Sequence, residues 1–315
     1  MPDIAIRTAA LTRDFPSVRA LDGMTLEVPA GSVFGFLGPN GSGKTTTIRL
    51  LLGLLEPSSG RAEVLGCDTR TQGDEIRRRS GALLEHSGLY ERLSAEENLE
   101  FYARVWRLNS AARRARVREL LENLGLAERR NETVGTWSRG MKQKLAIARV
   151  LLHRPDIVFL DEPTAGLDPV AAAALRDELA ALVLREGLTV FLTTHNLAEA
   201  GRLCASVGIV RNGRLLAVGP PDTLRTGAGG QRFEVKGRNI SAQAVAELRS
   251  RPEVAGLDPF EDRLEVTLRG AADIAPLIRL LVERGVEIDE VRRERASLEA
   301  AFLALMEEEP CLQTS

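Results

Sequence analysis

The sequence predicts an α/β fold, with a parallel sheet covered by helices on both faces, followed by a smaller α+β domain. The short apolar runs Ile157–Leu160 and Thr189–Thr193 alternate with helical patterns, as is typical of buried parallel strands. A glycine-rich loop stands between another apolar run, Ser32–Leu37, and the helical run Thr46–Leu55. The chain has 315 residues, of which 44% are hydrophobic, so one large domain with an appendix or two domains are expected.

The N-terminal part reads as short strands broken by turns, and these are predicted at Ile4–Ile6, Met24–Val28, Ser32–Leu37 and Arg61–Val64. From about 70 to 130 the chain is rich in arginine and has long helical patterns. Ser94–Glu97 is a capping box that opens one helix, and apolar spacing predicts a second at Ala111–Leu124. Acidic residues are mixed with the arginines, which favours solvated helix faces over a site for an acidic partner.

The glycine-rich run Thr226–Gly230 predicts a flexible linker. After it, strands are expected at Arg232–Lys236 and Arg263–Leu268, and helices at Ala242–Arg249, Ile274–Glu283 and Ser297–Met306. The last helix carries an apolar stripe of Leu298, Phe302, Leu305 and Met306. The expected domains are 1–225 with a helical subdomain at about 80–150, a linker at 226–230, an accessory domain at 231–309 and a tail at 310–315.

Composition limits the classes of partner. The net charge of −2 gives no reason to expect nucleic acid. Cys67, Cys204 and Cys311 lie far apart, outside metal-ligand spacing, and read as free thiols in a reducing compartment. The N-terminus does not resemble a secretory signal, and no stretch approaches 18 apolar residues. We therefore expect a cytoplasmic protein that does not span a membrane, although it could dock on a membrane-embedded one.

The most informative segment fits the pattern G-x-x-x-x-G-K-T and comprises Gly38, Pro39, Asn40, Gly41, Ser42, Gly43, Lys44 and Thr45. Its glycines let backbone N–H groups converge, and the start of the next helix, at Thr46, adds partial positive charge. Lys44 can reach the β- and γ-phosphates of a nucleoside triphosphate, and the Thr45 hydroxyl can bind Mg²⁺. A glycine-rich turn that binds nothing is the alternative, but strand, loop, Lys-Thr and helix in this order favour an ATP site.

Two adjacent carboxylates, Asp161 and Glu162, follow the apolar run Ile157–Leu160. In open α/β sheets ligands bind at the carboxyl ends of the strands. Asp161 is therefore a candidate Mg²⁺ ligand, and Glu162 is a candidate base for the water that attacks the γ-phosphate. A solvated pair at a strand end is the simpler alternative, and the phosphate loop upstream argues against it.

Two further features are the segment Trp137–Gln143, which begins a predicted helix running to His153, and His195 at the end of a predicted strand. With them, residues 4 to about 225 resemble the ATP-binding cassette (ABC) ATPases. The family's parts appear in order as Walker A at 38–45, a glutamine-loop position at 85, the signature at 137–143, Walker B at 157–162, a D-loop at Gly166–Pro169, and the switch His195. The resemblance implies a P-loop NTPase core with an inserted helical subdomain.

The resemblance also implies roles for individual residues. Ser138 and Gly140 would close over the ATP of a second copy, together with Asp168, in a head-to-tail dimer. Without the other family elements, Ser138 reads as an ordinary helix cap. His195, otherwise a satisfied core histidine, would sense the γ-phosphate. Phe15 is a candidate for stacking on the adenine, although an aromatic near the N-terminus is more often simple packing.

The chain departs from the family pattern at two places. Glu85 occupies the glutamine-loop position, where it keeps an oxygen for Mg²⁺ but loses the amide donor, so altered metal dependence and slower turnover are expected. The signature reads Ser-Arg-Gly-Met-Lys-Gln rather than the commoner Ser-Gly-Gly-Gln. This variant, with the run at 88–94 and the tail at 297–302, is similar to ATPase subunits of ABC-2-type exporters such as the daunorubicin-resistance and sodium-efflux ATPases.

The function implied is an ATPase subunit, peripheral on the inner face of the cell membrane, that powers a separate transmembrane permease exporting a drug, ion or lipid-like molecule. The permease would dock near residues 80–107. Two alternatives stay open. A non-transport ABC ATPase acting on nucleic acid or ribosomes usually carries a coiled-coil insertion or two cassettes, and this sequence has neither. A catalytically silent cassette is disfavoured by the presence of Lys44, Glu162 and His195.

Overall fold

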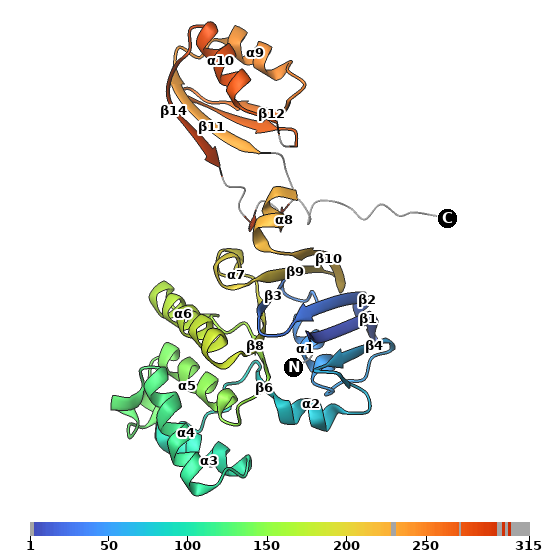
Figure 1. Ribbon diagram of the computed structural model, residues 1–315, viewed down its shortest axis with the longest axis vertical. Coiled ribbons are helices and arrows are strands. Elements are labelled where there is room, and N and C mark those ends of the chain that lie inside the picture. Colours follow the sequence, from blue (N-terminus) through green and yellow to red (C-terminus); the bar gives the residue numbers. More distant parts are fainter. Residues whose placement is uncertain (1–2, 228–230, 271, 295–297, 300–301, 304–315) are drawn as a thin grey trace. The chain divides into compact units, whose positions relative to one another are not determined.

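The computed structural model describes residues 3–227, 231–270, 272–294, 298–299 and 302–303 (Figure 1). The chain divides into two compact units, Met1–Val218 and Gly219–Ser315. Leu305, Met306, Cys311 and the tail at 310–315 lie outside the described residues, so the apolar stripe predicted on the last helix stays a prediction. Among the residues described, no helix has the length and apolarity required to cross a membrane.

A six-stranded sheet forms the centre of the first unit, in the order β10-β9-β3-β8-β7-β6. The strands are β3 (Val33–Leu37), β6 (Ser80–Leu83), β7 (Ile157–Asp161), β8 (Thr189–Thr194), β9 (Ser206–Arg211) and β10 (Arg214–Gly219). All neighbouring pairs from β9 to β6 are parallel. Every residue of β3 and β8 is buried, which requires cover on both faces and explains the uninterrupted apolar runs. The predicted α/β class is confirmed.

A second, antiparallel sheet has the order β2-β1-β4-β5. Its strands are β1 (Ile4–Phe15), β2 (Val18–Pro29), β4 (Ser59–Val64) and β5 (Cys67–Asp68). Both β1 and β2 are longer than predicted, because their hairpin pairing continues through several register shifts and carries polar residues with it. One apolar core joins the two sheets and includes Phe34, Phe36 and Phe159, whose rings lie 5.6 to 5.7 Å from that of Phe191.

The helices of this unit are α1 (Lys44–Leu51), α2 (Gly73–Arg79), α3 (Ala95–Val105), α4 (Ser110–Asn123), α5 (Arg139–Leu151), α6 (Pro169–Glu186) and α7 (Leu197–Leu203). Short 3-10 turns cover Ala127–Arg129 and Val134–Thr136. The predicted capping box is confirmed, since Glu97 N donates to Ser94 Oγ at 3.2 Å and Ser94 N donates to Glu97 Oε2 at 2.8 Å. In Figure 1 the green helices α3, α4 and α5 lie together, and they contact one another.

One boundary of the predicted helical subdomain needs correction. Residues 80–83, expected at its start, form β6 and pair with β7 in the central sheet. Gly81 explains the position, because a Cβ there would approach the Val150 carbonyl oxygen of α5 to 2.6 Å. Only a glycine lets α5 pack this closely on the strand.

The second unit has the order β11 (Arg232–Arg238), α9 (Ala242–Arg249), β12 (Val254–Pro259), β13 (Arg263–Leu268), α10 (Ala275–Glu283) and β14 (Glu287–Glu294). Its antiparallel sheet runs β12-β13-β11-β14, so the unit is a β-α-β-β-α-β fold of ferredoxin-like type with its own apolar core. In the same unit, the helix α8 (Pro221–Gly227) comes before β11. Thr226 and Gly227 are therefore helical, and not part of a linker as predicted, while 228–230 lie outside the described residues.

Candidate nucleotide site

The phosphate loop connects the carboxyl end of β3 to α1 and has a backbone that only glycine permits at key points. Gly41 and Gly43 have φ values of +80° and +101°. A Cβ on Gly38 would lie 2.5 Å from the Val210 carbonyl oxygen, and one on Gly43 would lie 2.5 Å from that of Ala20. Space and backbone conformation together explain why the loop needs its glycines.

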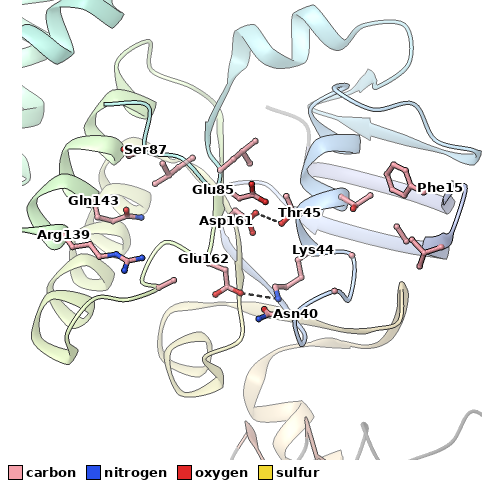
Figure 2. A pocket seen from close by; sticks show the side chains of 18 residues that line it. Phe15, Asn40, Lys44, Thr45, Glu85, Ser87, Arg139, Gln143, Asp161 and Glu162 are labelled. Carbon is pink, nitrogen blue, oxygen red and sulfur yellow. Dashed lines mark hydrogen bonds and ion pairs between the residues drawn. The ribbon is translucent and has the colours of Figure 1, made fainter. Parts of the chain in front are cut away.

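The loop forms one wall of a cavity of about 550 Å³ (Figure 2). The predicted site residues that line it are Phe15, Asn40, Gly41, Gly43, Lys44, Thr45, Thr46, Glu85, Asp161 and Glu162. The loop residues follow β3, and Asp161 and Glu162 stand at the end of β7. They meet because β3, β8 and β7 are neighbouring parallel strands whose carboxyl ends lie together. Gly38, Pro39 and Ser42 belong to the loop but do not line the cavity.

Lys44 is nearly buried, with only 7% of its side chain exposed. Its Nζ donates to the carbonyl oxygens of Gly38 and Pro39, at 2.8 and 3.2 Å. The same Nζ lies 3.3 Å from Glu162 Oε1. The ammonium group is thus held at the mouth of the loop, where a phosphate would meet it.

Asp161 is held by two hydroxyl groups. Thr45 Oγ1 donates to Asp161 Oδ2 at 2.6 Å, and Thr193 Oγ1 donates to Asp161 Oδ1. Thr193 Oγ1 in turn accepts a hydrogen bond from Glu162 N at 3.1 Å. One fully buried threonine on β8 therefore orients both adjacent acidic residues.

Glu162 has a φ of +50°, a left-handed conformation that is uncommon for a residue other than glycine. Its two carboxylate oxygens face different partners. Oε1 faces Lys44, and Oε2 lies 2.9 Å from His195 Nδ1. His195 is 62% exposed and lies outside the main cavity, in a neighbouring hollow that Glu162 also lines. His195 therefore contacts the carboxylate that is the candidate base, and its predicted role as a sensor of the γ-phosphate stays a prediction.

The oxygen atoms near Asp161 fit a Mg²⁺ ion. Mg²⁺ prefers one or two carboxylates combined with phosphate oxygens and water. The adjacent Thr45 hydroxyl and Asp161 carboxylate provide hard oxygen ligands of this kind. Among the described residues no cluster of three or more acidic, cysteine or histidine side chains could hold a metal ion.

Phe15 and Glu85 also line the cavity. Phe15 is half-buried, and the guanidinium of Arg13 lies 4.7 Å from its ring centre. The Glu85 side chain is 63% exposed, with Arg49 Nη2 at 3.9 Å from its Oε1. Neither carries the close contacts that hold Lys44 or Asp161, so their roles toward a nucleotide stay predictions.

Ser138, Gly140 and Asp168 do not line the cavity. Ser138 Oγ accepts from Met141 N at 3.3 Å and caps α5, while Asp168 Oδ1 accepts from Val170 N and Ala171 N and caps α6. A Cβ on Gly140 would lie 3.2 Å from Ala171 Cβ, so the two helix starts are close. These three residues therefore lie at two neighbouring helix starts, and none of them lines the cavity of its own chain.

Thr193, Arg139 and Gln143 are among the residues near the cavity that were not predicted as site residues. Thr193 orients the two carboxylates, while Arg139 and Gln143 line the wall formed by α5. Gln143 Nε2 also donates to the Pro163 carbonyl oxygen at 2.7 Å and ties α5 to the segment after β7. Arg139 and Gln143 belong to the signature segment, whose departure from the common family form was the available signal. The role of Thr193 could not be predicted from the sequence, because threonine is common in buried strands and its position there does not indicate contacts with acidic residues.

Comparisons with known proteins agree with this geometry. Residues 21–165 match the family described as ABC transporter. The daunorubicin resistance ATP-binding protein DrrA3 of Streptomyces coeruleorubidus is 38% identical over 313 residues, covering 97% of this chain and 96% of that protein. The bacitracin transport ATP-binding protein BcrA of Bacillus licheniformis is 35% identical over 302 residues, covering 96% of this chain and 97% of that protein.

Among solved structures, cbiO1 from Clostridium perfringens, part of the ABC transporter complex cbiONQ, superposes with a TM-score of 0.67 at 28% identity, covering 70% of this chain and 90% of that one. Fold, site and relatives agree that this is a nucleotide-binding P-loop ATPase. The chain belongs to the ATP-binding proteins of the ABC transporters, and it hydrolyses ATP.

Proposed function

We propose that this chain is the cytoplasmic ATPase subunit of an ABC-2-type exporter whose permease is a separate membrane protein. The observation that carries the proposal is the linked arrangement of Lys44, Glu162 and His195 beside the Thr45–Asp161 pair. At the carboxyl ends of the strands it brings together a cation that could bind phosphate, the candidate base and the histidine that contacts this base. The presence of these groups also argues against a catalytically silent cassette.

In the proposed mechanism Lys44 binds the β- and γ-phosphates, and Glu162 accepts a proton from the attacking water. The water oxygen forms a bond to the γ-phosphorus while the bond to the ADP oxygen breaks, releasing ADP and phosphate. His195 holds the Glu162 carboxylate toward the water. Thr45 and Asp161 would bind Mg²⁺, which neutralises charge on the phosphate oxygens.

The arrangement of Ser138, Gly140 and Asp168 supports a head-to-tail dimer of two copies. The α5 start offers backbone N–H groups, a hydroxyl and a helix dipole to an anion, while Ser138 and Gly140 do not line the nucleotide cavity of their own chain. A second copy would bring its ATP to this surface. ATP binding would then close the pair, and hydrolysis would reopen it.

The surface proposed for the permease includes a groove of about 420 Å³ bordered by β6, α3 and α5. The exposed side chains of Leu54 and Trp106 line it, and Tyr90, Phe101 and Val105 are further exposed apolar side chains of residues 80–107. Exposed apolar patches of this kind often mark protein contacts. The permease is the proposed occupant, which would hold this subunit on the inner face of the cell membrane. Relatives named for daunorubicin resistance, bacitracin transport and fluoroquinolone export favour a drug-like cargo.

The experiment that tests this function uses the variant Glu162→Gln. The amide keeps the size of the side chain but cannot accept a proton, so hydrolysis should fall by about 10² to 10⁴ while ATP binding persists. Sedimentation should then show an ATP-dependent dimer. Robust hydrolysis by the variant would refute the assignment of the base, and a monomer at saturating ATP would refute the proposed dimer.

A further inference from the structure

Arg139 is the first residue of α5 and follows Ser138 in the signature segment, at a position where the family commonly has glycine. Its side chain lines the nucleotide cavity of its own chain. In Figure 2 the guanidinium points from α5 toward the strand end that carries Asp161 and Glu162. Phe15 lies at the opposite end of the same cavity.

The position of Arg139 depends on Gly166, in the loop between β7 and α6. A Cβ on Gly166 would lie 2.2 Å from Arg139 Nη1 and 2.4 Å from its Cζ, so the guanidinium packs against this backbone. Gly166 has a φ of +70°, which also favours glycine. The loop is tied to α5 by the bond from Gln143 to the Pro163 carbonyl. The segment that follows the candidate base thus supports the arginine.

The Arg139 guanidinium lines the cavity without an acidic partner among the described residues, so it could bind a phosphate. Glu85, Asp161 and Glu162 line the cavity, with Lys44 and Arg139 as the lining cations. Lys44 lies within ion-pair distance of Glu162. Within the described part of the chain, no carboxylate pairs with Arg139. A planar guanidinium with several N–H donors matches the oxygens of a phosphate.

We propose that Arg139 binds the terminal phosphate of the ATP held by Lys44 of the same chain. The proposal rests on the proposed ATPase function and adds a residue to it. The terminal phosphate is favoured because the guanidinium points toward the strand end that carries Glu162, the candidate base (Figure 2). One helix start then serves two nucleotides, since Ser138 and Gly140 face the second copy while Arg139 faces its own site.

Equilibrium binding tests this assignment on the full chain, using a non-hydrolysable ATP analogue and ADP at protein concentrations where sedimentation shows a monomer. Arg139→Ala should weaken binding of the analogue about tenfold, equivalent to about 1.4 kcal/mol, and leave ADP binding unchanged. Arg139→Lys should give an intermediate affinity, because lysine keeps the charge without the planar fork. Arg114→Ala removes an equal charge from an exposed site on α4 and should bind like the parent.

The outcomes separate this proposal from the function on which it rests. Lys44→Ala should lose both ligands, and parent-like binding by that variant would refute the ATP site itself. If Lys44→Ala loses binding but Arg139→Ala binds the analogue like the parent, only the arginine proposal fails. Equal weakening of the analogue and ADP would overturn the terminal-phosphate assignment. A loss confined to the dimer would show that Arg139 acts on the other copy, and would also overturn it.

Discussion

Thr193→Val tests how the site is held together. The Thr193 hydroxyl donates to Asp161 Oδ1 and accepts from Glu162 N, and the residue is fully buried. Valine has nearly the same shape but can do neither. Glu162 N keeps a second partner, the Thr193 carbonyl oxygen at 3.2 Å, whereas Asp161 loses one of its two hydroxyl donors. A hydrogen bond to a charged group contributes about 1.5–3 kcal/mol, so unfolding by urea should show a loss of that size.

The effect on hydrolysis should be larger than the effect on binding. Without the hydroxyl, Asp161 and Glu162 are no longer oriented by a common atom, and a displacement of about 1 Å can reduce the rate about 10²-fold. Steady-state assays should therefore show a fall in kcat with little change in KM.

Thr189→Val is the matched control, because Thr189 is equally buried on the same strand and its Oγ1 accepts from Gly31 N at 2.9 Å. This variant should lose about 1 kcal/mol of stability and keep the parent kcat. The reasoning is refuted if Thr193→Val turns over at the parent rate, or if both variants lose kcat equally.

Three further outcomes are expected. Glu85→Gln should raise the Mg²⁺ concentration needed for half-maximal hydrolysis, because an amide is a weaker ligand than a carboxylate; superimposable Mg²⁺ titrations would dismiss a metal role for Glu85. Val105→Asp, at a position 62% exposed, should keep basal ATPase activity but reduce co-purification with the permease, and undiminished co-purification would argue against this docking surface. Burial raises the pKa of the Cys204 thiol to about 12. Iodoacetamide at mildly alkaline pH should therefore label Cys204 slowly in the native protein and readily in urea, as measured by peptide mass spectrometry. Rapid labelling of the native protein would contradict the burial of this thiol.

The local sequence pattern was sufficient to predict elements whose structure is determined by residues within the same segment. The capping box at Ser94 and the accessory elements Ala242–Arg249 and Arg263–Leu268 were predicted with these bounds, and the buried strand predicted at Thr189–Thr193 extends one residue further to Thr194. Each is specified by neighbours in sequence, through helix capping, continuous burial or alternation. The phosphate loop belongs to the same class, because its glycines and its Lys-Thr pair are contiguous.

Other features depend on contacts between distant segments and had no local signal. Residues 80–83 form a strand of the sheet against which α5 packs closely, and the glycine at position 81 makes this close packing possible. Arg139 faces the cavity because Gly166, on another loop, leaves space for its guanidinium. At Thr226 and Gly227 the glycine-rich composition suggested a linker, but the helix that starts at Pro221 continues through them. A glycine-rich composition favours a flexible linker, but here the preceding helix continues through these two residues.

The order β3-β8-β7 has a consequence for the dimensions of the site. Neighbouring strands are spaced about 4.8 Å apart, so the strand feeding the phosphate loop and the strand carrying Asp161 are about 10 Å apart. That width is a property of backbone hydrogen bonding, with β8 as the spacer. Side-chain substitutions can change the affinity and the rate at this site. The distance between the phosphate loop and Asp161, which a triphosphate has to span, is set by the spacing of the hydrogen-bonded strands.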